Sequence, residues 1–157
     1  MMHADFNWMR EALAEARAAG DAGEVPIGAV VVREGEIVAR GQNRVLRDND
    51  PTGHAEIVAM RAAAHALENY RLLGCELYVT LEPCAMCAGA MIHGRLARLV
   101  YAADDPKAGA VASVLQVLNH PCLNHQMAVE SGMLGDKAGE LLREFFRERR
   151  VEGPTRP

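Results

Sequence analysis

The sequence predicts an α/β protein in which a mixed five-stranded sheet is flanked by layers of helices. Runs of β-branched and apolar residues alternate along the chain with longer segments whose apolar residues recur at helical spacing. The first two strand-like runs, over residues 26–33 and 36–41, are separated by Glu34-Gly35, which predicts an antiparallel hairpin. Strands that are separated by helices tend to be parallel neighbours. The hairpin is therefore expected to supply the one antiparallel pair.

The chain opens with a predicted helix over residues 7–19, because the apolar residues there are spaced to share one helical face. Asp5 or Asn7 would cap the start of this helix, and Gly20 would end it. The helix is expected to pack against the sheet that the hairpin begins.

A polar loop over residues 44–53 follows the hairpin and is rich in turn-forming residues. A second helix is expected to begin near His54 and to end near Asn69. Its many alanines favour helix formation and let it lie close to a sheet. A third strand is predicted over residues 76–81, and Pro83 suits the first position of the next helix.

The rest of the chain is expected to continue the alternation and to end in a helix. The elements predicted after Pro83 are a helix over residues 84–93, strands over 98–102 and 126–130, a short helical turn over 114–118 and a closing helix over 138–150. The inner face of the closing helix is expected to carry Leu141, Leu142, Phe145 and Phe146.

We expect one domain over residues 1–157, long enough to bury a core without disulfides. No apolar run is long enough to span a bilayer and no signal segment is evident, so we expect a cytoplasmic protein without a membrane partner. The net charge of −4 argues weakly against nucleic-acid binding. Four arginines lie between Arg143 and Arg150, but glutamates interleave with them, and composition alone favours a solvated helix face.

Two short segments carry residues that suit a metal site, His54-Ala55-Glu56 and Pro83-Cys84-Ala85-Met86-Cys87. One imidazole and two thiols suit a tetrahedral zinc ion that keeps its fourth position open for catalysis. Each segment lies at the predicted start of a helix, where the helix dipole favours thiolate over thiol. Glu56 would then take a proton from water that the zinc activates.

Neither segment is specific by itself. A lone Cys-x-x-Cys is also found in redox pairs and in structural zinc sites, and a lone His-x-Glu carries little information. A structural zinc site would need a fourth protein ligand, for which Cys75, His93 and Cys122 are candidates. The combination of both segments, each at a helix start, favours a catalytic zinc site.

Together the two segments match the signature of the zinc nucleobase deaminases. From about Trp8 to Arg150 the chain also resembles the bacterial tRNA-specific adenosine deaminase family, within the cytidine/deoxycytidylate deaminase superfamily. The segments that carry this resemblance are Glu24–Val30, Asn43, Asp50–Thr52, Asn69–Leu72, Tyr78–Cys84, Ala88–His93 and Phe145–Arg147.

The resemblance implies a cytidine-deaminase-like three-layer α/β/α fold, a homodimer and one Zn²⁺ per subunit, with no organic cofactor. It also implies hydrolytic deamination of adenosine to inosine at the wobble position of a tRNA, bound through its anticodon stem-loop. His54, Cys84 and Cys87 would hold the zinc, and Glu56 would be the catalytic proton shuttle. Substrate contacts are implied for Val25, Asn43, Ala55, Leu81, Asp105, Lys107, Phe146 and Arg149.

Several of these substrate contacts have an implied role. The Asn43 amide would bind the purine edge, and the Ala55 N–H would hold the attacking oxygen. Asp105 would accept a hydrogen bond from a ribose 2′-hydroxyl, and Lys107 would contact phosphate. Phe146, Arg149 and Arg150 would line the RNA surface.

Two other functions remain open. A deaminase of free guanine or cytosine would share the fold and the zinc, but the arginine-bearing closing helix favours an RNA substrate. A non-catalytic zinc module would need four protein ligands and would give Glu56 no role.

Overall fold

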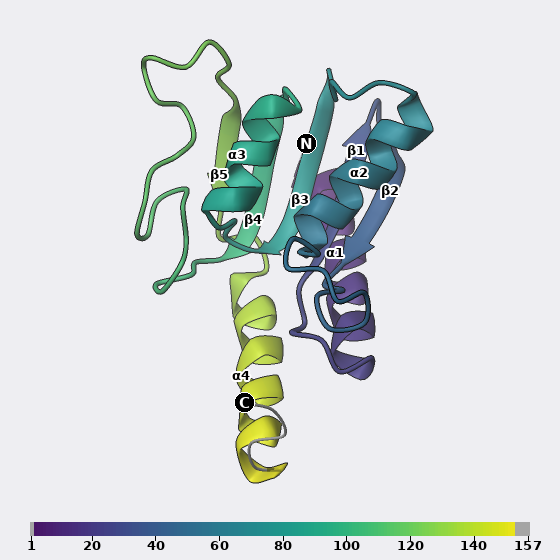
Figure 1. The fold of residues 1–157 in the computed structure, drawn as a ribbon, viewed down its shortest axis with the longest axis vertical. Helices are drawn as coiled ribbons and strands as arrows, with labels where there is room; N and C mark the ends of the chain where they lie inside the picture. Colours follow the sequence, from purple (N-terminus) through teal and green to yellow (C-terminus); the bar gives the residue numbers. More distant parts are fainter. Residues whose placement is uncertain (1, 153–157) are drawn as a thin grey trace.

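The computed structural model describes residues 2–152 and shows one five-stranded sheet with helices on both faces (Figure 1). The strand order across the sheet is β2-β1-β3-β4-β5. In chain order the elements are α1 (Met2–Asp21), β1 (Gly28–Arg33), β2 (Glu36–Gln42), α2 (Ala55–Leu67), β3 (Cys75–Leu81), α3 (Ala85–His93), β4 (Arg98–Ala103), β5 (Ala128–Ser131) and α4 (Gly135–Glu152). The mixed five-stranded sheet is confirmed.

The directions of the strands differ from the expectation at one boundary. The β1–β2 hairpin is antiparallel as predicted, but β1 is also antiparallel to β3. The prediction of a single antiparallel pair was therefore wrong. β3, β4 and β5 are mutually parallel. Because β1 alone is reversed, the other four strands all end at the same edge of the sheet.

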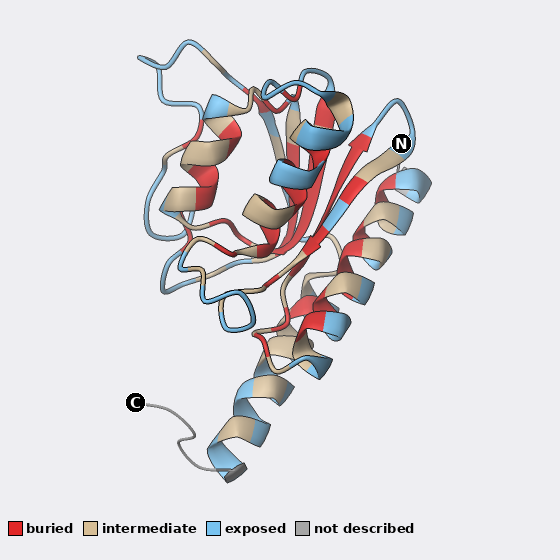
Figure 2. Cartoon of the chain, turned by 45° about the vertical axis from the view of Figure 1, so that its right-hand side comes forward, coloured by how far each residue is buried: buried red, intermediate tan, exposed pale blue. Residues whose placement is uncertain are grey.

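Side chains alternate between two separate cores, as the pleat of a strand requires. On one face, Ala29 and Val31 of β1 pack in a cluster with α2 and α3. On the other face, Val30 and Val32 pack with α1 and with Ala138 of α4. The buried residues in Figure 2 lie along the strands and on the helix faces turned toward them. The three-layer α/β/α prediction is therefore confirmed.

Two glycines let helices approach the β1–β2 hairpin closely. A Cβ on Gly28 would lie 2.1 Å from the Ala12 carbonyl oxygen of α1. A Cβ on Gly41 would lie 2.5 Å from the Ala55 carbonyl oxygen of α2. Both distances are far below van der Waals contact, so any larger residue would push a helix away from the sheet.

The start of α1 differs from its prediction, and Asp5 has a different role from the expected helix cap. The helix begins at Met2, so Asp5 lies in its first turn and is not its cap. Its buried carboxylate accepts hydrogen bonds from the Tyr78 hydroxyl at 2.8 Å and from Arg98 Nη2 at 2.8 Å. Arg98 also pairs with two further carboxylates, those of Glu76 and Glu130. This network ties α1 to three strands.

The C-terminal third of the chain contains two further corrections. Residues 114–118 do not form the expected helical turn. The inner face of α4 is shorter than predicted, since Leu141 packs against the sheet cluster but Phe146 is 47% exposed. Figure 1 gives the reason, because α4 extends beyond the edge of the sheet. None of the helices that the structure describes is both long and apolar enough to cross a membrane.

Candidate active site

The two segments predicted to bind metal meet because of the strand directions. β2 and β3 both run antiparallel to β1, so both end at the same edge of the sheet. α2 follows β2 and α3 follows β3, and Figure 1 shows their starts at that edge. The topology therefore brings together residues that are some 30 positions apart, as the contact between His54 and Cys84 shows.

His54 and Cys84 hold equivalent positions at these helix starts. His54 is the N-cap of α2 and Cys84 is the N-cap of α3, and neither side chain makes a capping hydrogen bond. Both side chains are therefore available to a ligand. Pro83 precedes the N-cap, so its predicted place at the first helical position was wrong. Its carbonyl oxygen instead accepts a hydrogen bond from the Ala110 N–H at 2.8 Å.

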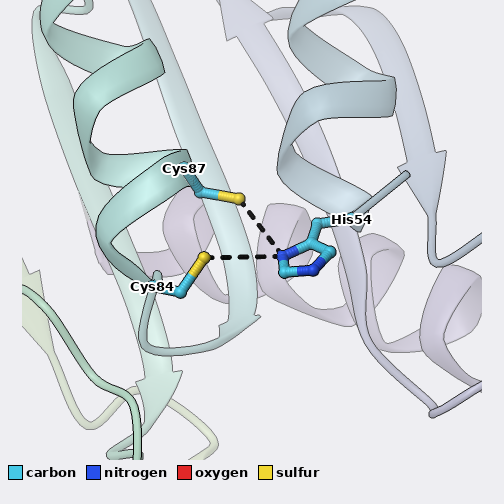
Figure 3. A group of neighbouring side chains, drawn as sticks. All are labelled: His54, Cys84 and Cys87. Atoms are coloured by element: carbon cyan, nitrogen blue, oxygen red, sulfur yellow. Dashed lines mark hydrogen bonds between the residues drawn. The ribbon is translucent and has the colours of Figure 1, made fainter. Parts of the chain in front are cut away.

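The two thiols and the imidazole form a compact group (Figure 3). His54 Nδ1 lies 3.5 Å from Cys84 Sγ and 3.5 Å from Cys87 Sγ. These ligand atoms all lie within 4.8 Å of one another, and no fourth His, Cys, Asp or Glu of residues 2–152 joins the group. Such an arrangement suits a metal ion with one open position and disfavours a structural site with four protein ligands.

The close approach of the sulfurs determines their ionisation. A hydrogen bond from Cys87, followed by one from His54, lowers the pKa of Cys84 to about 3. The same hydrogen bond to Cys84, together with burial, raises the pKa of Cys87. The Cys84 thiolate also raises the pKa of His54. A divalent cation would replace the shared proton and allow both thiols to ionise.

Glu56 lies in the first turn of α2 and is only 4% exposed. Its side chain lines the same cavity as His54 and Cys84 and lies beside Cys87. Burial raises the pKa of this carboxyl. A buried carboxyl with a raised pKa holds a proton more readily than an exposed one, which suits a group that accepts and returns a proton.

Asn43 and Ala55 contact each other, which corrects one expectation. The Ala55 N–H donates a hydrogen bond to Asn43 Oδ1 at 3.0 Å. The Ala55 N–H is therefore already paired with a side chain, whereas the resemblance implied that it would hold the attacking oxygen. Because the carbonyl oxygen of the Asn43 amide faces this N–H, its NH₂ group is left for a ligand.

A cavity of about 1320 Å³ opens over these residues. Seven of the eight predicted substrate contacts line it, and Ala55 is the exception. Those seven are Val25, Asn43, Leu81, Asp105, Lys107, Phe146 and Arg149. Arg143, Arg147 and Arg150 of α4 also line the cavity, so cationic side chains are concentrated along one helix.

Two of the lining residues have structural contacts that the sequence did not suggest. Asp105 Oδ1 accepts hydrogen bonds from the backbone N–H groups of Lys107 at 3.0 Å and Ala108 at 3.2 Å. Arg149 donates to the Gly23 carbonyl oxygen, and its guanidinium lies 4.6 Å from the centre of the Phe145 ring. Only the remaining atoms of these two side chains are available to a substrate.

Glu82 was given no role by the sequence analysis, yet it organises one side of the cavity. It is 2% exposed and accepts hydrogen bonds from the backbone N–H groups of Asp105, Val111, Ala112 and Ser113 and from the Ser113 hydroxyl. Burial would raise the pKa of Glu82, but these donors outweigh it and lower the pKa to about 2. The available signal was an acidic residue between an apolar strand and Pro83.

Glu24 was also missed and is also 2% exposed. It accepts hydrogen bonds from the Leu46 N–H at 3.1 Å and from Arg47 through both its N–H at 2.9 Å and its Nε at 3.1 Å. Arg47 in turn donates to the Asn43 carbonyl oxygen. Glu24 therefore supports the segment that carries Asn43.

Comparison with known proteins adds a family to this geometry. The family profile described as MafB19-like deaminase matches residues 3–150. A protein of Agrobacterium fabrum named tRNA-specific adenosine deaminase is 49% identical over 93% of this chain and 96% of its own length. A protein of the same name from Aquifex aeolicus is 46% identical over 91% of this chain and 94% of its own length.

Solved structures of deaminases also resemble this chain. A chain from a study of A-to-I editing by tRNA:A34 deaminases at the wobble position of transfer RNA superposes with a TM-score of 0.84. It is 48% identical and covers 87% of this chain and 99% of its own. A guanine deaminase from Nitrosomonas europaea superposes with a TM-score of 0.77 at 32% identity, over 89% of this chain and 83% of its own.

Proposed function

Because the chain belongs to the family of the tRNA-specific adenosine deaminases, we propose that it converts adenosine to inosine at the wobble position of a tRNA anticodon. The observation that carries this proposal is the 49% identity over 93% of the chain to a protein of that name. The reaction is hydrolytic, since water replaces the 6-amino group and ammonia leaves. An adenosine in an anticodon loop is already unpaired, so moving it into a cavity costs less than flipping it from a duplex.

The donor set supports Zn²⁺ as the resident metal, held by His54, Cys84 and Cys87. With Zn–N near 2.0 Å and Zn–S near 2.3 Å, the nitrogen and a sulfur of a tetrahedral site lie roughly 3.5 Å apart. The two N–S separations of 3.5 Å fit that value. When bound, the metal would supply Lewis acidity that lowers the pKa of water to about 7.

Glu56 is the proposed proton shuttle. Its carboxylate accepts a proton from the water that adds to purine carbon-6 and delivers it to a ring nitrogen. It then accepts the remaining proton of the hydroxyl on carbon-6 and passes it to the amino group, which leaves as ammonia as the carbonyl forms, so the balance is adenosine plus water to inosine plus ammonia. Burial of Glu56 supports this role, because the carboxyl is shielded from bulk water and its pKa is raised.

The other lining residues would orient the substrate. The NH₂ group of Asn43 is available to donate to an acceptor on the purine edge. The second carboxylate oxygen of Asp105 can accept from a ribose 2′-hydroxyl, which distinguishes RNA from DNA. Lys107 and the α4 arginines border the cavity, and guanidinium groups suit contacts with phosphate. Phe146, 47% exposed, offers a ring on which an unpaired base can stack.

We also propose that the protein acts in the cytoplasm as a homodimer, with one Zn²⁺ per subunit. α3 carries no Asp, Glu, Lys or Arg. A second groove, lined by Ile57, Met60, Tyr70 and Ala90 among others, runs between α2 and α3. An apolar helix of this kind suits burial against a second copy. Sedimentation equilibrium should then give twice the mass of one chain.

Deamination of free guanine is the second candidate, supported by the 32% identical guanine deaminase. That likeness is weaker than the 48% identity to the chain from the tRNA-editing study. The non-catalytic zinc module is less well supported, because only three potential ligands cluster in the part of the chain that the structure describes.

The decisive experiment is incubation of the zinc-loaded protein with an anticodon stem-loop that carries adenosine at the wobble position. Inosine should appear at that position, while free adenosine, guanine and cytosine should turn over slowly or not at all. Appreciable turnover of the free bases alone would reverse the assignment.

A matched variant separates chemistry from metal binding. Glu56→Gln should lower kcat by about 10²–10⁴-fold, because the general acid–base group is lost. It should retain its zinc, since His54, Cys84 and Cys87 are unchanged. Undiminished deamination in this variant would refute the proposed role of Glu56.

A further inference from the structure

The segment over residues 105–113 contributes one side of the cavity but has little structure of its own. It lies between β4 and β5 and contains turns but no helix or strand. Asp105, Lys107 and Ala108 line the cavity, so the position of this segment determines which atoms face a substrate. Something outside the segment must therefore fix it.

Glu82 supplies that anchor from the end of β3. Its two carboxylate oxygens accept hydrogen bonds from both ends of the segment, from Asp105 N–H at 3.0 Å and from Ala112 N–H at 2.9 Å and Ser113 N–H at 3.0 Å. A single buried carboxylate therefore sets the distance between the two ends. A carboxylate that accepts several N–H groups makes hydrogen bonds stronger than neutral ones.

The packing around the carboxylate is equally close. A Cβ on Gly109 would lie 2.4 Å from Glu82 Cδ, so the segment folds directly over the anionic group. Gly109 N–H bonds to the Asp105 carbonyl oxygen at 2.9 Å, which closes the turn. The loop and the carboxylate thus fit each other, and neither can move without breaking several hydrogen bonds.

We propose that Glu82 is a positioning residue that holds residues 105–113 in their substrate-binding conformation and thereby sets the affinity for the RNA substrate. The inference rests on the proposed function for its substrate. Glu82 does not touch the reacting atoms; it acts through Asp105 and Lys107. The affinity of a site falls in proportion to the fraction of time that its binding conformation is populated.

The test compares Glu82→Gln with the zinc-loaded parent protein. If the amide leaves the loop in place about a tenth of the time, KM for the anticodon stem-loop rises ~10-fold. We expect kcat to change by less than about 3-fold, because Glu56 and the metal ligands stay in place. Hydrogen exchange measured by mass spectrometry should become faster in peptides that cover residues 105–113 and should stay unchanged in α3.

Two control variants accompany it. Glu36→Gln makes the same change at an exposed position of the hairpin and should alter neither KM nor exchange. Ser113→Ala removes one donor and keeps the carboxylate, so its effect should be smaller and in the same direction. This variant tests the inference if Glu82→Gln fails to fold.

The exchange measurement needs no substrate, so it separates this inference from the proposed function. Faster exchange with no activity on any RNA would leave the anchor intact and reject the substrate. Unchanged exchange together with unchanged KM would overturn the inference. Loss of zinc with a collapse of kcat would overturn it too, because Glu82 would then be supporting Cys84 and not the loop.

Discussion

The segments anchored by Glu24 and Glu82 both border the cavity, but the two buried carboxylates are neutralised differently. Glu24 pairs with the Arg47 guanidinium and with two backbone N–H groups. Glu82 has no cationic partner in the part of the chain that the structure describes and is held by four N–H groups and one hydroxyl. One segment is therefore held partly through a cationic side chain, and the other through backbone N–H groups and a hydroxyl without any cation.

This difference indicates how each segment can respond to change. Arg47 is 27% exposed in its side chain, so its guanidinium can turn to water when its partner is lost. The backbone donors around Glu82 have no such freedom while the loop keeps its conformation, and they can reach water only if the loop itself moves. Donors left unpaired in a buried site cost the most free energy.

The largest expected effect is on stability. Glu82→Ala should lower the free energy of unfolding by about 3–4 kcal/mol, because several backbone donors lose their acceptor. Glu24→Ala should cost about 2 kcal/mol, since Arg47 can be resolvated. Urea unfolding of both variants at one fixed zinc concentration measures the two values. Equal costs would remove the distinction between the two anchors.

A smaller loss of stability is expected when a methyl group is added next to the Glu82 carboxylate. Gly109→Ala should cost about 1–3 kcal/mol through overpacking against the Glu82 carboxylate. In a Glu82→Ala background the same change should cost less than about 0.5 kcal/mol, because the carboxylate is gone. Urea unfolding of the four proteins measures this coupling.

Gly20→Ala provides the control for that cycle. The new Cβ would lie 3.4 Å from the Pro26 Cβ, an ordinary contact, and the position is helical. This variant should be neutral or more stable by up to about 1 kcal/mol. A cost at Gly109 that persists without Glu82 would show that the backbone, and not the carboxylate, limits the space.

The smallest effect is a pH dependence at Glu24. Burial raises its pKa, but the N–H groups of Arg47 and Leu46 and the Arg47 side chain outweigh it, so the pKa is lowered from 4.5. A lowered folded pKa gives stability above pH 4.5 that is lost as the pH falls through the folded value. Glu24→Gln should therefore lose less stability than the parent protein between about pH 5 and pH 3. Parallel acid unfolding curves would contradict this role.

The sequence predicted the elements well where the signal was local. The β1–β2 hairpin, the helix start at His54 and the approach of Cys84 to Cys87 each depend on residues a few positions apart, and the structure has all three. The pairing of β1 with β3 could not be predicted, because apolar periodicity marks a strand but not its neighbour.

The missed contacts are long-range for the same reason. Asp5 is a residue type that commonly caps helices, and its position in the sequence suggested that role. Its partners Tyr78 and Arg98 instead come from strands far along the chain. Glu82 reaches a loop more than twenty residues away. Phe146 fits the apolar spacing of α4, and only the extension of α4 beyond the sheet leaves it exposed. The sequence alone does not distinguish a buried acidic residue from an exposed one, or an exposed phenylalanine from a buried one.

The reversed strand β1 has a consequence for the order in which the chain assembles. β1 lies between the strands that lead to the two metal-binding helices, and its pairing with β3 joins Ala29 to Val79, across a long stretch of chain. The hairpin can form early, but closing so long a loop is slow. We therefore expect that His54 comes together with Cys84 and Cys87 only after β3 has paired with β1. A newly made chain should then bind its metal tightly only late in folding.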